Sequence, residues 1–511
     1  MITGDLLLGV DVGTQATKAV LLDVSGEQLA TAQSEYRVDL PKPLWAEQWP
    51  CVWLDACVEV IREVIGSVEA RGRRVAGLCV SSLYGGSGIP LDRDLAPVRP
   101  CLIWMDRRAT QQAEWVKENI DTEELFSITG NWVDSYFGYT KILWLRENEP
   151  ENWERTALFL PPHSYIVFRL TGSVLMDHSS AGNLSGIYDI HSRAWSADAA
   201  NLLGIPLDLM PEQLACSDEI VGEIHEAGSK LTGLPVGTPV LAGGVDAPMA
   251  TLGAGAMDAG NAVVMMGSST CWGIVHEGET YSPDLVSMPH VENGLRKVYT
   301  WAGSATSGAA VNWARHTLVQ PGEALGAVRR GIPTFKELDD AARLVTPGCE
   351  GLVVLPYLMG ERAPVWDPAA RGAIFGLTLA HTSAHIYRAF LEGVGYALRH
   401  AMDVGQAAGL PKSESVTVVG GVTRSPVWLQ ILADITGRPL RTLKTQGIGA
   451  PLGDAFLVGK SLGMLDREVG IAKWLSFSDP IRPELGHRRI YDECYRTFRQ
   501  LYEETRPLLG P

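Results

Sequence analysis

Two aspartates stand where apolar runs end, the positions from which a carboxylate can act on a bound molecule. Asp11 follows one such run and Asp246 follows another. Gly243 and Gly244 come just before Asp246, and glycines allow another group to approach the backbone closely. We therefore expect Asp246, near the midpoint of the 511 residues, to be the chemical centre over which the two halves of the chain close.

Two predicted β-hairpins carry tips of small and hydroxyl-bearing residues. The first tip spans residues 13–18 and includes Thr14 and Lys18, and the second spans residues 267–270 and includes Ser268. Such loops suit phosphate oxygens, and their repetition predicts a duplicated domain with a ligand's phosphates held between the tips. Each tip alone is equally consistent with an ordinary polar turn, because glycine and threonine are common turn residues.

A third candidate element is a strand over residues 415–419 that opens into Gly420 and Gly421, with a helix beginning at Pro426. A glycine turn beside a helix N-terminus is the arrangement that nucleotide sites use. Many α/β turns share this pattern without holding a ligand, so the pattern alone does not establish a site.

The segment Trp104-Met105-Asp106-Arg107-Arg108 follows a predicted strand and combines an aromatic ring with an acid and two cations. These groups would suit a corner that binds a polyol. The competing interpretation is an acid at a helix N-terminus followed by a solvated helix.

Strand and helix patterns alternate along the whole chain, which predicts an α/β fold. The opening three strands are expected to be antiparallel, unlike a dinucleotide-binding unit, which turns from strand directly into helix. The segment 177–183 is expected to be a connecting loop. The segment 453–461 resembles a Walker A loop but has five residues between its glycines and a helical pattern, so we set it aside.

Composition narrows the class of protein. The net charge of -16 disfavours nucleic acid or an anionic membrane as the main partner. The eight cysteines are scattered without metal-site spacing, and no apolar run reaches the ~18 residues of a membrane span. We expect a cytoplasmic protein with two or more domains.

Taken together, these motifs resemble the FGGY family of carbohydrate kinases, which includes xylulokinase and glycerol kinase. The resemblance covers almost the whole chain and rests on residues 9–14, 45–48, 104–108, 243–246, 267–269, 360–364, 371–372, 391–393 and 420–421, with Trp428, Gln430, Ala433 and Asp434. It implies two actin-like (ribonuclease H-like) ATPase domains with an interdomain cleft. We expect a sugar-binding domain at residues 1–250 and a nucleotide-binding domain at residues 251–511.

The resemblance also implies roles for single residues. Asp246 would be the general base, and Asp11 would hold Mg²⁺, through water. The sugar would lie near Gly85, Gly86, Asp106, Tyr136 and Asp246. The residues matching family positions around ATP are Thr14, Lys18, Gly267, Ser268, Gly308, Asn312, Gly421 and Ser425.

The sequence departs from the family pattern at the sugar end of the site. Gly85-Gly86 stand where xylulokinases carry Met-His, and Met105 and Ala247 stand where an amide is usual. Each change removes a hydrogen-bonding group, and such groups discriminate strongly between substrates. The identity of the sugar is therefore open.

The expected activity is transfer of the ATP γ-phosphoryl group to a pentulose such as D-xylulose. Another polyol or keto-sugar, such as erythritol, glycerol or ribulose, is the alternative within the same chemistry. A non-metabolic actin-like ATPase is a further alternative, because the same fold serves nucleotide-driven machines. The family is often dimeric, so a homodimer is also expected.

Overall fold

A computed structural model describes residues 5–67, 70, 72–319, 333–444, 449–466 and 469–508. The chain divides into two compact units, neither of which is one continuous segment. The first unit comprises Met1–Ala259, Val275–Thr300 and Gln446–Ser476, and the second comprises Gly260–Ile274, Trp301–Thr445 and Phe477–Pro511. The domain ranges 1–250 and 251–511 remain an expectation, and each unit is described by itself below.

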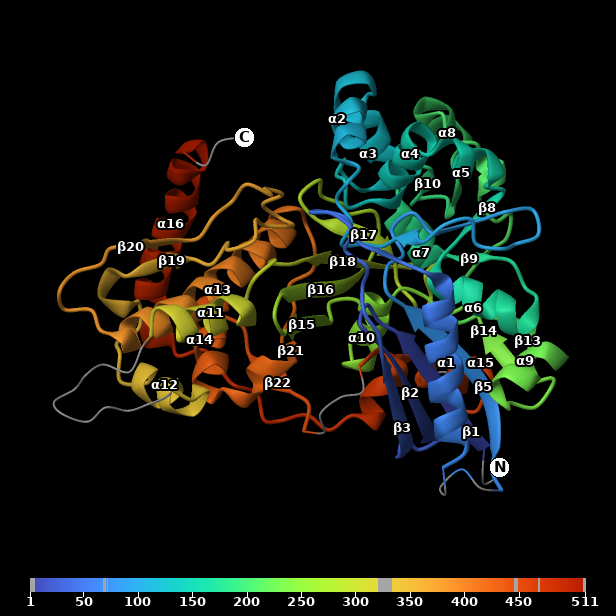
Figure 1. Cartoon of the computed structure of the whole chain (residues 1–511). Coiled ribbons are helices and arrows are strands. Elements are labelled where there is room, and N and C mark those ends of the chain that lie inside the picture. The colour runs from blue at the N-terminus through green and yellow to red at the C-terminus, as the bar shows by residue number, and fades with distance from the viewer. Residues whose placement is uncertain are drawn as a thin grey trace. The chain divides into compact units, whose positions relative to one another are not determined.

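A six-stranded sheet forms the centre of the first unit (Figure 1), and its strand order is β13-β14-β5-β1-β2-β3. Strand β1 pairs antiparallel with β2 and parallel with β5, and β14 runs parallel to β5. The antiparallel start of the chain confirms the expected opening strands. The bounds are β1 Asp5–Val12, β2 Ala16–Asp23, β3 Gln28–Glu35, β5 Arg74–Ser82, β13 Ile220–Glu223 and β14 Pro239–Leu241.

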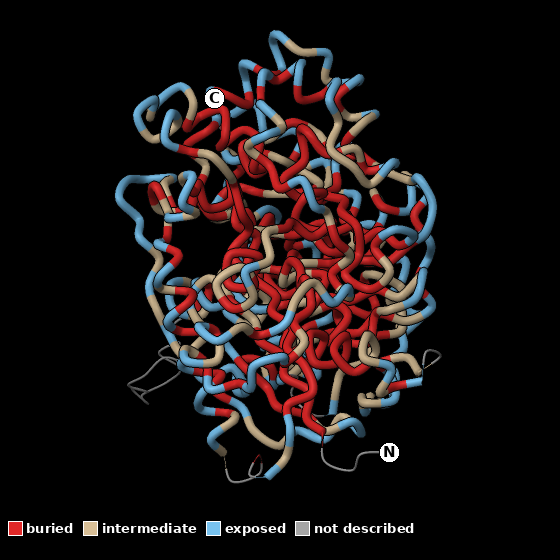
Figure 2. The backbone as a smooth tube through the Cα atoms, turned by 90° about the vertical axis from the view of Figure 1, so that its right-hand side faces the viewer, coloured by how far each residue is buried: buried red, intermediate tan, exposed pale blue. Residues whose placement is uncertain are grey.

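Both faces of this sheet are buried, which explains the nearly continuous apolar run of β1. Side chains alternate along a strand, so Leu6, Leu8 and Val10 pack with helices α1 (Pro50–Ile65) and α6 (Pro162–Thr171). Leu7, on the opposite face, packs with α10 (Asp246–Gly253) and α15 (Ala450–Ser461). Figure 2 shows such buried stretches in red. Asp11 shares the face of Leu7 by the same alternation.

The remainder of the first unit consists of short helices and two-stranded sheets. The prediction of a connecting loop at residues 177–183 is wrong, because helix α7 spans His178–Leu184. The Asp177 carboxylate accepts hydrogen bonds from the backbone N–H groups of Ser179 and Ser180, and this cap starts the helix. The other elements are β4 Glu47–Gln48, β6 Ile89–Leu91, β7 Cys101–Leu102, α2 Thr110–Asn119, α3 Thr122–Thr129, α4 Gly138–Asn148, α5 Pro150–Arg155, β8 Leu158–Leu160, β9 Met176–Asp177, β10 Tyr188–Asp189, β11 Ala194–Trp195, α8 Ala197–Leu203, β12 Leu214–Ala215 and α9 Glu226–Thr232.

The second six-stranded sheet has the strand order β17-β18-β16-β15-β21-β22. Strand β15 pairs antiparallel with β16 and parallel with β21, which repeats the pattern of β1, β2 and β5. The bounds are β15 Ala262–Met266, β16 Thr270–Glu277, β17 Val286–Pro289, β18 Lys297–Ala302, β21 Val416–Val419 and β22 Leu440–Thr442. The other elements are α11 Gly308–Thr317, α12 Phe335–Ala342, β19 Val353–Leu355, β20 Ala373–Phe375, α13 Ser383–Ala407, α14 Pro426–Thr436 and α16 Arg488–Thr505.

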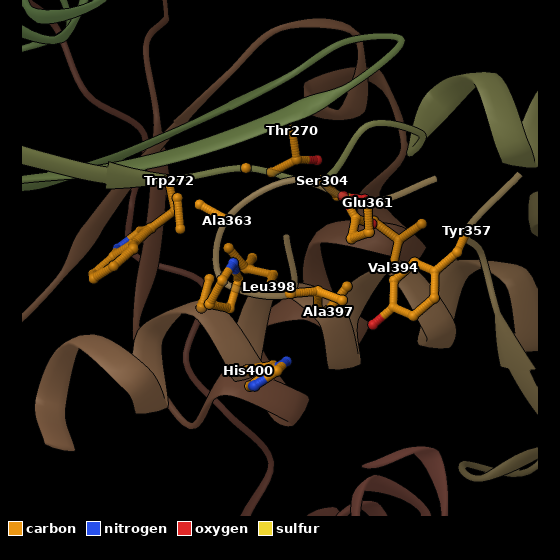
Figure 3. Close-up of a pocket in the computed structure, with 15 residues that line it drawn as sticks. Thr270, Trp272, Ser304, Tyr357, Glu361, Ala363, Val394, Ala397, Leu398 and His400 are labelled. Atoms are coloured by element: carbon orange, nitrogen blue, oxygen red, sulfur yellow. The ribbon is translucent and has the colours of Figure 1, made fainter. Parts of the chain in front are cut away.

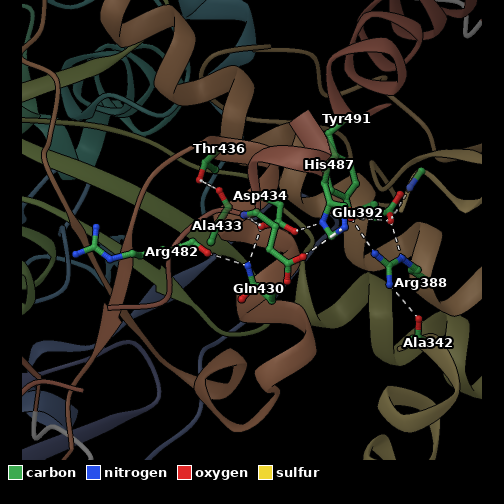
Figure 4. Close-up of polar contacts among 12 residues, drawn as sticks. Ala342, Arg388, Glu392, Gln430, Ala433, Asp434, Thr436, Arg482, His487 and Tyr491 are labelled. Carbon is green, nitrogen blue, oxygen red and sulfur yellow. Dashed lines mark hydrogen bonds and ion pairs between the residues drawn. The ribbon is translucent and has the colours of Figure 1, made fainter. Parts of the chain in front are cut away.

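Buried polar contacts fasten the helices of the second unit to one another (Figure 4). Arg388 on α13 donates to Glu392 at 2.8 Å and to the Tyr491 hydroxyl of α16 at 2.9 Å. Asp434 on α14 lies 2.8 Å from the His487 ring. Each buried charge has a partner, as burial in a low-dielectric interior requires. These contacts hold the helix that begins at Pro426 in place.

Among the helices of the described residues, none has the length and apolarity that crossing a membrane would require.

Strand β1 lies so close to α15 that only glycine fits between them. A Cβ at Gly9 would stand 2.0 Å from the carbonyl oxygen of Pro451 and 2.8 Å from the nitrogen of Ala455. We expect Gly9→Ala to destabilise the first unit by about 1–3 kcal/mol or more, because overpacking forces backbone shifts. Thermal unfolding checks this, with Gly486→Ala as the control, since no atom lies within 4 Å of a Cβ there. An unchanged melting temperature for Gly9→Ala would contradict the close packing of β1 on α15.

Candidate active site

Asp11 lies near the carboxyl end of β1, between two neighbouring strands. In the register of the sheet it stands opposite Lys18 on β2 and Ser81 on β5. Burial raises the pKa of Asp11 to about 6, although the Lys18 charge and the Ser81 hydroxyl act in the opposite direction. Its Oδ1 atom is buried without a hydrogen-bond partner among the described residues. An orphaned carboxylate oxygen of this kind is free to accept a ligand.

Asp246 is the first residue of α10, directly after the turn that leaves β14. Burial raises the pKa of its carboxyl well above the usual value, and the negative charge of Asp11 raises it further. Asp11 and Asp246 therefore lie close enough to influence each other. The residue as a whole remains partly exposed at the start of the helix. Burial and the Asp11 charge make this carboxylate more basic than an ordinary aspartate, and basicity is what a general base needs.

A third carboxylate, which the sequence analysis did not find, lies beneath this pair. Asp454 of α15 is fully buried. It accepts hydrogen bonds from the Ser81 hydroxyl at 2.7 Å and from the Cys79 thiol at 3.3 Å. Burial raises its pKa well above the usual value, and the charge of Asp11 contributes as well. The available signal was one acid inside an otherwise small and apolar helix, in the segment set aside as a false Walker A loop.

The residues around Asp11 fit a magnesium ion held in part by other ligands. No group of three or more His, Cys, Asp or Glu side chains in the described part of the chain could enclose a metal ion. Mg²⁺ usually keeps several waters and binds through one or two carboxylates plus the phosphates of a substrate. The free Oδ1 atom of Asp11 suits that mode of binding.

The first predicted phosphate tip contacts the predicted polyol corner. Trp104 donates its indole N–H to the Thr14 hydroxyl at 3.0 Å, and Gln48 donates to the Thr14 carbonyl at 3.1 Å. Lys18 is exposed on β2, in register with Asp11. The structure thus brings Thr14, Lys18 and Asp11 to one end of the first sheet.

Asp106, predicted to bind the sugar, turns its carboxylate into the protein. The residue is fully buried, and it accepts hydrogen bonds from Ala46 N at 2.7 Å, Arg108 N at 3.0 Å and Arg108 Nε at 2.8 Å. Arg108 in turn stacks on the Trp45 ring, 3.6 Å from its centroid. In this arrangement Asp106 shapes the loop, and its role at the sugar stays a prediction.

Tyr136, the other predicted sugar residue, belongs to a loop held from behind by a lysine that the sequence analysis missed. Lys141 of α4 is fully buried and donates to the carbonyls of Ser135 and Tyr136, each at 2.7 Å. Burial lowers the pKa of Lys141 to about 7. The Tyr136 ring lies 5.3 Å from that of Tyr84, centroid to centroid.

Gly85 and Gly86 leave no empty space where their side chains would be. A Cβ at Gly86 would stand 2.0 Å from the Leu102 carbonyl oxygen, and its φ of +54° disfavours other residues. A Cβ at Gly85 would stand 2.5 Å from Pro162 Cδ. The backbone of this loop is packed directly on neighbouring chain, so its glycines reflect close packing in this protein.

The predicted nucleotide residues of the second unit gather at one end of the second six-stranded sheet. Gly308 at the start of α11 donates its N–H to the Gly267 carbonyl at 3.0 Å, and Ala309 donates to the Ser268 carbonyl at 3.0 Å. A Cβ at Gly308 would stand 2.4 Å from the oxygen of Gly267, so helix and tip touch only because glycine is there. Asn312 is exposed, one turn further along α11.

The parallel pairing of β15 with β21 sets the Gly420-Gly421 turn beside this tip. A Cβ at Gly420 would stand 2.4 Å from the Met266 oxygen, whereas Gly267 and Gly421 have no atom within 4 Å of a Cβ. Ser425 caps α14, its hydroxyl accepting a hydrogen bond from Trp428 N at 3.2 Å. Two open glycines near two helix N-termini form a surface suited to an anion.

A small pocket lies behind the second tip, within the second unit (Figure 3), and Thr270, Ser304, Glu361, Tyr357 and His400 are among its lining residues. The Glu361 carboxylate accepts hydrogen bonds from the Ser304 hydroxyl and from Ala305 N, both at 2.7 Å. Burial raises its pKa to about 7. Glu361 thereby ties the chain before α11 to the loop that follows β19.

Comparisons with known proteins agree with this geometry. Residues 6–253 match the model of the FGGY family of carbohydrate kinases, N-terminal domain, and residues 262–461 match the model of its C-terminal domain. A xylulose kinase of Lactococcus lactis is 30% identical over 508 residues, covering 98% of this chain and 97% of the relative. A gluconokinase of Bacillus subtilis is 27% identical, covering 97% of this chain and 94% of the relative. The crystal structure of xylulose kinase from Rhodospirillum rubrum superimposes with a TM-score of 0.89 at 29% identity, covering 99% of each chain.

The raised pKa of Asp454 predicts how replacing its carboxyl group changes the stability of the protein. Because the folded-state pKa lies above the unfolded value of ~3.9, the native protein loses stability as the pH rises above that value. Asp454→Asn keeps the shape without the charge. Its melting temperature relative to the unaltered protein should therefore rise progressively as the pH is raised from about 4, the unfolded-state pKa, toward neutrality. Thermal melts across this range check the expectation, with the exposed Asp55→Asn as the control. If the difference in melting temperature between Asp454→Asn and the unaltered protein stays constant or falls as the pH rises, the expectation is contradicted.

Proposed function

Because the chain belongs to the FGGY family of carbohydrate kinases, we propose that it transfers the γ-phosphoryl group of ATP to a hydroxyl of a pentulose such as D-xylulose. The observation that carries this proposal is Asp246, a partly exposed residue at the start of α10 whose carboxyl pKa is raised by burial and by Asp11. The full-length likeness to xylulose kinases supports the choice of substrate.

In the proposed reaction Asp246 accepts the proton of the sugar hydroxyl as its oxygen attacks the γ-phosphorus. The bond between that phosphorus and the β–γ bridging oxygen breaks, and ADP leaves with the electron pair. Mg²⁺, which Asp11 would hold through water, would neutralise charge on the phosphates. Holding the hydroxyl beside a base and in line with the phosphorus accounts for much of the rate in such transfers.

We propose phosphate-binding groups in each unit. In the first unit, the Thr14 hydroxyl and the exposed Lys18 lie on the hairpin beside Asp11. In the second unit, the proposed nucleotide residues are Gly267, Ser268, Gly308, Asn312, Gly421 and Ser425. The open backbone at Gly267 and Gly421 supports this assignment, since a ligand can approach both.

The sugar is proposed to lie near Asp246, with Tyr136, Asp106 and the Gly85-Gly86 loop forming the surrounding wall. Arg108 and Ala46 already engage the Asp106 carboxylate, so this side chain does not by itself select D-xylulose. Erythritol, glycerol and ribulose are therefore alternative acceptors. D-Gluconate is a second candidate, since the likeness to a gluconokinase also spans the full chain.

We also propose a cytoplasmic location. All eight cysteines are free thiols, and five of them are buried, as suits a reducing compartment. Assembly as a homodimer, expected from the family resemblance, remains a prediction.

An assay of ADP release tests the proposed function. With Mg-ATP, we expect D-xylulose to stimulate turnover above the basal ATPase rate. The panel should also contain ribulose, erythritol, glycerol and D-gluconate. Greatest stimulation by one of these would reassign the acceptor within the kinase chemistry, and no stimulation by any sugar or polyol would contradict the kinase proposal.

The assigned base has its own test. Asp246→Asn should lower kcat by about 10²- to 10⁴-fold, the usual contribution of general base catalysis, while ATP still binds. Stopped-assay product formation gives kcat, and titration with a fluorescent ATP analogue gives affinity. Asp55→Asn, an exposed change in the same unit, serves as the control. Full activity in Asp246→Asn would remove Asp246 from the mechanism.

A further inference from the structure

A chain of hydrogen bonds buried behind the base connects three segments that are distant in sequence. Ser82, His163, Asp177 and Ser179 form this chain, which we call the Asp177 network. The Ser82 hydroxyl lies 2.7 Å from His163 Nδ1, and His163 Nε2 lies 2.9 Å from Asp177 Oδ1. Each of the four side chains is at most 1 % exposed, so no substrate reaches them. The arrangement of serine, histidine and aspartate is therefore structural in this protein and cannot act as a hydrolytic triad.

The charge state of Asp177 fixes the direction of the bond between His163 and Asp177. Burial alone would raise its pKa, but hydrogen bonds from His163, Ser179 and Ser180 lower the pKa below its ordinary value. The ionised carboxylate only accepts, so His163 must donate through Nε2–H. The Ser82 hydroxyl, 2.7 Å from His163 Nδ1, donates to the Leu83 carbonyl oxygen at 3.0 Å.

The other end of the network reaches the peptide just before the base. The Ser179 hydroxyl donates to Asp177 Oδ2 and accepts a hydrogen bond from Val245 N at 3.0 Å. The backbone N–H of Ser82 donates to the Gly244 carbonyl at 3.0 Å. Both polar groups of the Gly244–Val245 peptide are therefore held, one by each end of the network. This peptide leads directly into Asp246.

The two glycines before the base make this contact possible. A Cβ at Gly244 would stand 2.7 Å from the Ser217 hydroxyl and 2.9 Å from that of Ser179. Gly243 has a φ of +72°, and a Cβ there would stand 1.9 Å from the Val80 oxygen. Protein groups, and not a ligand, are what approach the backbone closely at this turn.

Building on the proposed function, we propose that Ser179 and the network behind it position Asp246 for catalysis. The network orients the peptide from which α10 starts. It thereby sets the direction in which the Asp246 side chain leaves the backbone. Ser82 also ends the strand that carries Ser81, the neighbour of Asp11. One buried network thus fixes the base relative to the strand beside the other carboxylate.

Ser179→Ala tests the proposal, because it removes only the acceptor for Val245 N–H and one donor to Asp177. Assayed with Mg-ATP and D-xylulose, it should lower kcat about 10- to 100-fold and leave both KM values within about twofold, because misplacement by about 1 Å carries that cost. Ser196→Ala is the matched control, since its hydroxyl likewise accepts a backbone N–H, at 3.2 Å from Ala199 N, at a distant helix start. An unchanged kcat in Ser179→Ala would overturn the proposal.

Amide hydrogen exchange gives a second readout that needs no substrate. Peptides covering residues 242–250 should exchange faster in Ser179→Ala than in the unaltered protein or in Ser196→Ala, at an unchanged melting temperature. Unaltered exchange would overturn the proposal even if the proposed sugar kinase activity held. If D-xylulose gave no turnover, the proposed acceptor would fail while the exchange result still decided whether Ser179 holds this peptide. Should the alanine variant not fold, Ser179→Cys keeps a similar shape with a weaker acceptor and tests the same bond.

Discussion

Three carboxylates share the carboxyl end of one buried sheet, and the repulsion between their charges constrains the first unit. Asp11, Asp246 and Asp454 come from a strand, a helix start and a helix interior, and burial raises the pKa of all three. Like charges in a low-dielectric site cannot all ionise without cost. Neutral hydrogen-bond donors, such as the Ser81 hydroxyl, and the positive charge of the exposed Lys18 offset this cost. A cation bound near Asp11 would relieve it further.

Much of this arrangement followed from the sequence because local signals were strong. Apolar runs ending in an acid predicted β1 and the turn before Asp246, and glycine-rich tips predicted both hairpins. The helix expected to begin at Pro426 is α14, Pro426–Thr436. The resemblance to carbohydrate kinases then assigned roles that no local pattern could supply. Family membership and the two-domain kinase fold confirm the resemblance itself, and the roles of single residues stay predictions.

The other features of the site could not be predicted from the sequence, because they depend on tertiary contacts between distant residues. Asp454 accepts a hydrogen bond from Ser81, 373 positions away in the sequence, and neither segment contains a local pattern that predicts this contact. The segment 177–183 contains the small polar residues of a loop, yet a cap at Asp177 makes it helical and couples it to His163. Asp106 had the correct residue type for a sugar ligand, but Arg108, two residues later, draws its carboxylate inward.

The discontinuous composition of the first unit has a consequence for synthesis in the cell. Strand β1 leaves the ribosome long before α15, which covers one face of it. Until residue 476 has emerged, the apolar face around Leu7, Val20 and Leu22 lacks its final cover. Contacts of such high sequence separation form slowly, and exposed apolar surface invites aggregation. The nascent chain is thus a natural client for chaperones, and a fragment ending before α15 would leave one face of its central sheet uncovered.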